Sequence, residues 1–417
     1  MSKNVLIIGG GVIGLATAYY CARRGHRVTL LERRGEEHEN CSWGNAGLVV
    51  PSHFVPLAAP GMVALGLKWM WDPESPFYIK PRMSWDLFAW VARFWRAATA
   101  AHVRRSAPLL RDLNLASRAC FEELAALPDN DFGLVTRGLV ILCRTQHALD
   151  DEARLAERAN ELGVPAQVLD RNGLAELDPQ VTTNAVGGVF FPKDCHLLPE
   201  QFLAGLRRLA AAAGAVSQWN TEVTGFAQQG ERLAAVQTSR GAFQGDEIVL
   251  AGGAWSPVIV RQLGLKIPMQ AGKGYSLTLS SPPQLPQVSA VCVEARIAVT
   301  PMAGRLRFGG TMELAGLNEQ VSARRVQGII NNALKYYPAF SPQDFEGIVP
   351  WCGLRPCSPD GLPYLGRTAK YANLTIATGH AMMGLSLGPI TGRIVAEIVS
   401  DERPSFDLQL LCPDRYR

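Results

Sequence analysis

The chain has 417 residues, of which 47% are apolar and 19% charged, and its formal net charge is +4. This composition excludes a disordered chain, a collagen-like chain and a disulfide scaffold, and at roughly 100–200 residues per domain the length predicts two or three compact units. The small net charge provides no electrostatic footprint for nucleic acid, so we predict no nucleic-acid partner.

The cysteines and the first residues indicate the cellular compartment in which the protein is expected. Nine cysteines are scattered without a C-x-x-C pair, which favours reduced thiols and predicts no metal site. The apolar run Val5–Ile8 is too short for a signal core, and no stretch of about 18 uncharged apolar residues follows. We therefore expect a cytoplasmic protein, and peripheral attachment to the inner face of the membrane stays open.

The first elements form a strand–helix–strand unit. Val5–Ile8 is a β-branched run typical of a buried parallel strand, residues 12–24 have helical spacing, and Arg27–Leu31 is a second strand. The turn Gly9–Gly14 (GGGVIG) permits close approach of a pyrophosphate at a helix N-terminus. Glu32 would hold a ribose hydroxyl, so the unit predicts a dinucleotide site; the alternative is a glycine-rich turn without a ligand.

Further elements follow along the chain. Residues 54–105 contain five of the nine tryptophans, and residues 106–165 look helical around a strand at Gly138–Cys143. A helix is predicted at Pro199–Gly214 from its proline start and glycine stop. The remaining predicted strands are Glu247–Leu250, Leu306–Gly310 and Leu374–Ala377.

Two motifs near the C-terminal end have the character of a ligand site. Gly379–Gly384 leads into a predicted helix whose glycines at 384, 388 and 392 share one face, which something flat or a backbone could approach closely. Close packing of small residues is the alternative. Arg355 stands on a strand before a Pro-Asp-Gly turn and suits a two-pronged grip on a carboxylate, with a structural ion pair as its alternative.

The alternation of helices and strands predicts an α/β fold. We expect a discontinuous Rossmann-like FAD-binding domain (residues 1–55, 146–255 and 346–417) and an α+β substrate-binding domain with a mainly antiparallel sheet (residues 56–145 and 256–345).

These motifs together resemble the D-amino-acid oxidase superfamily of FAD enzymes, and most of all its bacterial D-amino-acid dehydrogenase branch. The resemblance covers nearly the whole chain. Its most specific parts are the strings Lys273–Thr278 (KGYSLT) and Gly353–Pro356 (GLRP), the second followed by a Pro-Asp-Gly turn, in this order. The segment Ser42–Gly47 (SWGNAG) also matches.

The resemblance implies FAD as the cofactor. Sarcosine-oxidase relatives tether flavin through a cysteine upstream of the Pro-Asp turn, and Cys352 stands one residue out of that register, so we expect noncovalent FAD. The implied FAD contacts are Gly9, Gly11, Val12, Ile13, Gly14, Glu32, Arg33, Ser42, Asn45, Ala46, Gly47, Leu48, Val223, Gly252, Gly253, Gly353, Gly379, Gly384, Leu385, Ser386 and Leu387.

The resemblance also implies the chemistry, which is hydride transfer from the substrate's Cα to flavin N5, giving an imino acid. Arg355 would bind the substrate carboxylate. Tyr275 is the candidate second partner, with a packed core tyrosine as its alternative, because residues 297–300 (IAVT) lack the tyrosine of glycine-oxidase relatives. His53 is a third candidate for substrate binding, since alanine-type dehydrogenases tend to have a tyrosine there.

The segment at 381–389 (AMMGLSLGP) is similar to that of the D-hydroxyproline and D-proline dehydrogenase type. We therefore expect dehydrogenation of small D-amino acids, and of cyclic ones in particular. The first alternative is a glycine/sarcosine-type amine oxidase. A tRNA-modifying flavoprotein is the alternative from another class, and the net charge of +4 argues against it.

The electron acceptor is open between oxygen, a quinone and an electron-transfer protein. The aromatic and basic residues at 54–105 would suit contact with a membrane surface. The alternative is a helical lid that covers the active site.

Overall fold

The computed structural model describes residues 1–416 apart from 70–74 and 81. Its first sheet has six strands in the order β19-β20-β13-β1-β2-β9. The neighbours from β20 to β9 are parallel, and β19 is antiparallel to β20. The strands are β1 (Asn4–Ile8), β2 (Arg27–Leu31), β9 (Val216–Gln218), β13 (Glu247–Leu250), β19 (Tyr364–Arg367) and β20 (Leu374–Thr378).

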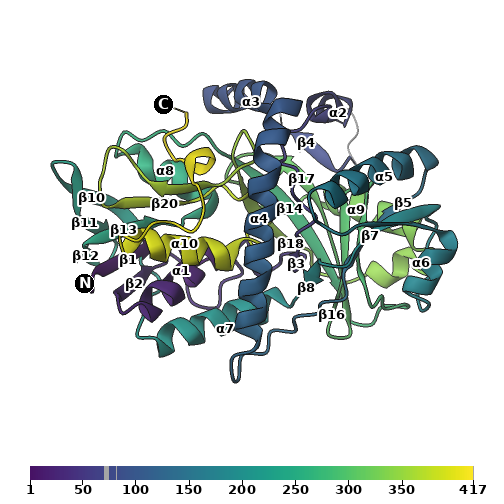
Figure 1. Cartoon of the computed structure of the whole chain (residues 1–417), viewed down its shortest axis with the longest axis horizontal. Helices are drawn as coiled ribbons and strands as arrows, with labels where there is room; N and C mark the ends of the chain where they lie inside the picture. The colour runs from purple at the N-terminus through teal and green to yellow at the C-terminus, as the bar shows by residue number, and fades with distance from the viewer. Residues whose placement is uncertain (70–74, 81, 417) are drawn as a thin grey trace.

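Helices cover this sheet because β1, β13 and β20 are almost wholly apolar and buried. The helix α1 (Val12–Arg23) packs against α10 (Gly388–Val399) and α7 (Pro199–Ala212). The long helix α4 (Ala100–Ala125) also contacts α10, and it crosses the middle of the molecule between the two large sheets in the view of Figure 1.

The second large sheet has nine strands, eight of them in the order β18-β14-β17-β16-β15-β5-β7-β6, and β4 pairs with β17. Its pairs are antiparallel except β15–β5 and β17–β4. The strands are β4 (Phe77–Ile79), β5 (Leu139–Cys143), β6 (Gln167–Asp170), β7 (Gly187–Phe191), β14 (Gln270–Leu279), β15 (Ser289–Cys292), β16 (Ile297–Met302), β17 (Arg305–Leu314) and β18 (Trp351–Cys357).

Smaller elements complete the fold. A three-stranded antiparallel sheet holds β10 (Val223–Gln229), β11 (Arg232–Thr238) and β12 (Gly241–Gln244), and β3 (Leu48–Val49) pairs with β8 (Cys195–His196). The other α-helices are α2 (Met62–Trp69), α3 (Trp85–Ala97), α5 (Gln146–Glu161), α6 (Arg171–Leu177), α8 (Ser256–Arg261) and α9 (Ala323–Tyr336). The 3-10 helices are η1 (Gly253–Trp255), η2 (Pro342–Phe345), η3 (Ala381–Met383) and η4 (Gln409–Leu411).

The predicted fold class is confirmed: a Rossmann-like parallel sheet is joined to a mainly antiparallel one. The boundaries of the two predicted domains stay a prediction. Three strands inside the ranges predicted for the FAD-binding domain, β6, β7 and β18, pair in the second large sheet.

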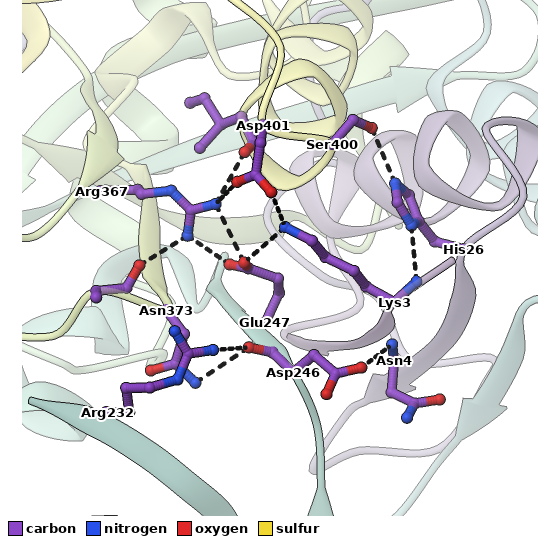
Figure 2. Close-up of polar contacts among 12 residues, drawn as sticks. Lys3, Asn4, His26, Arg232, Asp246, Glu247, Arg367, Asn373, Ser400 and Asp401 are labelled. Atoms are coloured by element: carbon purple, nitrogen blue, oxygen red, sulfur yellow. Dashed lines mark hydrogen bonds and ion pairs between the residues drawn. The ribbon is translucent and has the colours of Figure 1, made fainter. Parts of the chain in front are cut away.

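The edge of the first sheet where β1 and β13 begin carries a cluster of ion pairs (Figure 2). Glu247, at the start of β13, is 4% exposed and accepts from Lys3 at 3.1 Å and from Arg367 at 2.5 Å. Asp401, just after α10, bonds the same two cations at 2.6 and 3.0 Å. The cluster therefore ties together the ends of β1, β13, β19 and α10.

Candidate active site

One cavity of about 650 Å³ lies where β1, β2 and β13 end and continues over the second large sheet. All three predicted substrate residues and most of the predicted FAD residues line it. The lining FAD residues are Gly9, Gly11, Val12, Ile13, Glu32, Arg33, Ser42, Asn45, Ala46, Leu48, Val223, Gly252, Gly253, Gly353, Gly384 and Leu385. Parallel strands bring their carboxyl ends to one edge, which is where α/β sheets bind ligands.

The glycine-rich turn has the geometry that a pyrophosphate needs. Gly9 has φ +112°, and a Cβ there would lie 2.4 Å from the carbonyl oxygen of Ala251. The helix α1 begins after Gly11, which has no side chain to cap it, and the backbone N–H of Val12 donates to the Ser42 Oγ at 3.4 Å. The helix dipole and the N–H groups of the first turn together favour an anion at this end.

Glu32 lies beside this turn and is 8% exposed. Its carboxylate accepts from the backbone N–H of Gly10 at 2.7 Å and of Arg34 at 3.0 Å, which fixes its direction. A carboxylate held in this way retains lone pairs for ribose hydroxyls. On the neighbouring wall, the Arg33 guanidinium stacks 4.1 Å from the ring centroid of Trp255.

The segment Ser42–Leu48 is held against the second large sheet by two side chains that sequence reasoning did not single out. Arg307, 3% exposed, donates to the carbonyl of Asn45 at 2.7 Å, and Ser276 donates to that of Gly44 at 2.9 Å. The indole of Trp351 fills the space where a Cβ on Gly44 would be, at 2.0 Å. Only contacts across distant segments reveal these roles.

Five predicted FAD residues do not line the cavity, and each supports it from behind. A Cβ on Gly14 would lie 1.8 Å from the Gly9 carbonyl oxygen, and one on Gly47 would lie 2.3 Å from that of Leu197. Gly379 has φ +81° and abuts Tyr364. Ser386 is 1% exposed and its Oγ donates to Asn114 at 2.9 Å, while Leu387 is buried in the core.

The predicted glycine face after residue 384 is only partly present. The helix α10 begins at Gly388, and Gly384 precedes it. A Cβ on Gly388 would lie 2.8 Å from Val12, and one on Gly392 would lie 2.6 Å from the backbone of Ala16. At those two glycines α1 packs closely, in agreement with the close-packing alternative, whereas Gly384 lines the cavity.

Arg355 is a cation of this site that has no carboxylate partner in the described part of the chain. Its Nη1 donates to the carbonyl of Thr311 at 2.6 Å. Within the described residues 1–69, 75–80 and 82–416, no carboxylate lies within 4.0 Å of its guanidinium. Burial lowers the pKa of Arg355, since no carboxylate nearby offsets the loss of solvent. The structural ion pair considered as an alternative is therefore absent from this part of the chain.

The backbone around Arg355 is shaped to receive its guanidinium. A Cβ on Gly274 would lie 2.2 Å from Nη2, so only glycine at that place lets the group lie flat on β14. Thr311, which supplies the accepting carbonyl, has φ +66°, a conformation rare for a β-branched residue. Such strain is typical of ligand-binding sites.

Tyr275 lines the cavity, but its hydroxyl turns to the protein. It is 1% exposed, and its hydroxyl donates to Glu313 at 2.6 Å, which is also 3.4 Å from the ammonium of Lys273. Burial and this carboxylate raise the pKa of Tyr275. The contact agrees with the packed-tyrosine alternative, and the assignment of Tyr275 to the substrate carboxylate stays a prediction.

Three histidines, His38, His53 and His380, line the cavity, and burial holds His53 and His380 neutral. The pKa of His53 is lowered to about 4 by burial and by Arg296, and that of His380 to about 3. His380 Nε2 is 3.0 Å from the hydroxyl of Thr391. His53 Nδ1 is 3.1 Å from that of Ser52.

The cavity thus fits FAD. Its glycine turn, the N-terminus of α1 and Glu32 suit a ribose and pyrophosphate, and one continuous cavity joins them to Ser42–Leu48 and Gly384. Cys352 also lines this cavity, where burial raises its pKa, and its Sγ lies 3.0 Å from the carbonyl of Glu319.

Known proteins were compared with this chain. A family described as FAD dependent oxidoreductase matches residues 4–398. A protein named D-amino acid dehydrogenase from Granulibacter bethesdensis is 34% identical, and one so named from Agrobacterium fabrum is 32% identical; each match covers 99% of both chains. Glycine oxidase from Geobacillus kaustophilus is similar in structure, with 27% identity, a TM-score of 0.80, and 100% and 99% of the two chains covered.

Proposed function

Because this chain belongs to the FAD dependent oxidoreductase family, we propose that it is a dehydrogenase of cyclic D-amino acids such as D-hydroxyproline or D-proline. Its full-length curated relatives named D-amino acid dehydrogenase support the coarser activity, an FAD-dependent D-amino-acid dehydrogenase. The observation that carries the proposal is Arg355, a half-buried residue that lines the cavity and has no carboxylate partner within the described residues.

The cavity wall favours a ring. Met312, Met382 and Met383 line it together with Ala381 and Leu385. Methionine side chains adapt to irregular apolar shapes, so such a wall can enclose a five-membered ring. For a cyclic amine, the wall then needs few polar groups apart from those that contact the ring nitrogen.

In the proposed reaction, Arg355 binds the substrate carboxylate through two parallel hydrogen bonds and fixes the orientation of Cα. Bound FAD supplies the acceptor for the hydride that leaves Cα. The buried walls exclude water, which strengthens the interaction between guanidinium and carboxylate. We expect FAD to be held without a covalent bond, so acid precipitation should leave the flavin in solution.

The deciding experiment is the visible spectrum of the holoenzyme under anaerobic conditions. The D- and L-isomers of proline, hydroxyproline and alanine are added one at a time. Bleaching of the flavin band by a cyclic D-isomer, with its L-isomer inactive, is the expected result. Bleaching by sarcosine or glycine alone would instead establish the glycine/sarcosine-type oxidase, and bleaching by D-alanine alone would contradict the cyclic substrate.

We also propose that α3 rests on a membrane surface, where a quinone would take the electrons. Its outward face exposes Trp85 (89%), Phe88 (55%) and Trp95 (66%). On its inward face, Trp90 Nε1 donates to the carbonyl of Cys357 at 2.9 Å, which holds the helix to the body as a cover. Aromatic rings beside basic residues such as Arg96 are typical of helices that lie in the interface.

No helix in the described part of the chain is long and apolar enough to cross a bilayer. The side chain of Trp69, and Trp71 as a whole, lie outside the described residues. Co-sedimentation with vesicles of mixed zwitterionic and anionic lipid tests the proposal. Changing Trp85, Phe88 and Trp95 to Gln should reduce vesicle binding at least tenfold, whereas a control with the exposed Val216 and Val349 changed to Gln should not. Equal binding by both variants would contradict it.

A further inference from the structure

A buried carboxylate lies behind His53 and is not used by the function proposed so far. Asp194 is fully buried in the turn between β7 and β8, and its Oδ1 accepts from the backbone N–H of Ser52 at 3.0 Å. Its Oδ2 accepts from the Ser52 hydroxyl at 2.5 Å. The Ser52 Oγ is in turn 3.1 Å from His53 Nδ1. Three side chains therefore form a continuous hydrogen-bonded chain from the interior to the cavity.

The number of protons along this chain determines the tautomer of His53. The Ser52 hydroxyl has one proton, and it points to the ionised carboxylate of Asp194. Its oxygen must then accept from His53, so the Nδ1 of a neutral imidazole bears the proton. The other nitrogen, Nε2, is left with a lone pair, and no hydrogen bond occupies it within the described residues.

We propose that Asp194, Ser52 and His53 form a proton relay that takes a proton from the substrate's amino group, with His53 Nε2 as the atom in contact. The inference rests on the proposed function, since a D-amino acid enters as an ammonium and hydride departure needs its free electron pair. His53 lines the same cavity as Arg355, which would hold the other end of the substrate.

Every proton that leaves one group of the relay is accepted by the next group, and no group is oxidised or reduced. The ammonium N–H bond breaks as Nε2–H forms, the Nδ1 proton passes to Ser52 Oγ, and the hydroxyl proton passes to Asp194 Oδ2. The amine keeps its electron pair, and His53 is neutral before and after. Ser52 and Asp194 act through His53 and never touch the substrate.

The charges around the relay suit this division of roles. Arg296 and burial lower the pKa of His53 to about 4, so the ring does not hold the proton. Burial raises the pKa of Asp194 to about 7, against the hydrogen bonds from Ser52 and the charge of Arg118. A carboxylate that is ionised just above neutral pH can accept the proton of the substrate amine and release it again after each turnover.

The substitution Asp194→Asn tests the relay with nearly the same shape. An amide nitrogen in place of Oδ2 would donate to Ser52, whose hydroxyl would then donate to His53 Nδ1 and move the ring proton to Nε2. The ring could no longer accept from the substrate. ¹⁵N chemical shifts of His53 at pH 8 should show an Nδ1–H ring in the wild type and an Nε2–H ring in the variant. A wild-type ring that bears its proton on Nε2 would overturn the proposal.

The kinetic readout is the rate of anaerobic flavin bleaching by the substrate that the wild type reduces, measured from pH 6 to pH 10. We expect Asp194→Asn to lose about 100-fold at pH 7, because a positioned proton acceptor contributes about 10²–10⁴-fold. The loss should shrink as pH rises through the pKa of the substrate amine, since free amine then enters directly. A purely structural role would lower the rate equally at every pH, and that result would contradict the relay.

Two controls separate the outcomes. Asp178→Asn changes another buried aspartate, which accepts from the backbone of Gln287 at 2.7 Å away from the cavity lining, and should leave the pH profile unchanged. Cyclopentanecarboxylate, a ring with a carboxylate and no amine, should bind wild type and Asp194→Asn equally. If no D-amino acid bleaches the wild type, the proposed function fails and the relay with it; if the wild type is bleached and the variant matches it at every pH, only the relay fails.

Discussion

Two arginines at opposite edges of the fold have opposite surroundings. Arg367 lies where β1 and β13 begin, and it is bonded by Glu247 and Asp401 in the cluster of Figure 2. Arg355 lies beside the cavity, and within the described residues its only hydrogen-bond partner is the carbonyl of Thr311. Burial lowers the pKa of Arg355.

The difference separates a charge that stabilises the fold from a charge kept for a ligand. A buried cation without a counter-ion destabilises the folded state, so it persists where a ligand supplies the missing carboxylate. A cation with two carboxylate partners has no capacity for a third. Substitutions at the two edges should therefore affect different quantities.

The largest effect is expected for Arg355→Leu. Loss of one partner of a buried, hydrogen-bonded charge pair costs about 2–5 kcal/mol, so kcat/KM should fall by about 1,000-fold. The free energy of unfolding in urea should not fall, because the variant no longer buries an unpaired charge. Arg367→Leu is the control, with unchanged KM. Unchanged KM for Arg355→Leu would refute its role as the carboxylate anchor.

The next effect concerns the other edge. Glu247→Gln leaves Lys3 and Arg367 without their shared buried carboxylate, and we expect the free energy of unfolding to fall by about 3 kcal/mol. Flavin reduction per bound FAD should be unchanged. Glu402→Gln, in a pair with Arg24 that is 54% exposed at the carboxylate, should cost less than about 1 kcal/mol. Equal losses from both would show that burial of the cluster is unimportant.

A smaller effect distinguishes two glycines of one sequence pattern. Gly392→Ala would force a Cβ within 2.6 Å of the α1 backbone, so unfolding should become easier by about 1–3 kcal/mol. Gly384→Ala meets no atom closer than 3.8 Å and should leave stability unchanged, while its methyl intrudes on the FAD cavity and raises the Kd for FAD. Urea denaturation and FAD titration of both variants provide the check, and the reverse pattern would contradict it.

The smallest effect is a pH dependence. His380 has a folded-state pKa of about 3, against an ordinary value of 6.5, so the unfolded chain binds more protons and stability falls as pH drops below 6.5. Between pH 8 and pH 6 this amounts to about 1 kcal/mol. His380→Gln should remove that part of the slope in urea denaturation with saturating FAD. The raised pKa of Asp194 changes the stability with pH in the opposite direction. It does so equally in the wild type and in His380→Gln, so it does not affect the difference between them.

The sequence predicted the first half of the site well because its signals are local. A strand, a glycine turn, a helix and an acid within about 30 residues specify the Gly9–Glu32 unit, and it folds as expected. The unpaired state of Arg355 was open, since a counter-ion could have come from anywhere in the chain. Arg307, Trp351 and Asp194 were missed for the same reason: their partners are more than a hundred residues away.

The glycine pattern after residue 384 shows what a local sequence signal cannot predict. Its four-residue spacing predicts a helix face that a flat ligand or a backbone can approach, and the spacing does not say which of the two does so. Helix α10 begins one turn later, and the approaching group at Gly388 and Gly392 is α1.

The contact between α1 and α10 joins segments near residues 12–23 and 388–399. During synthesis, the glycine turn leaves the ribosome long before β13 and α10 have been made. Until then, one edge of β1 has no strand partner and an apolar face of α1 is uncovered. At about 5–20 residues per second this interval lasts tens of seconds. Nascent chains of this protein should therefore need a chaperone that shields the N-terminal segment.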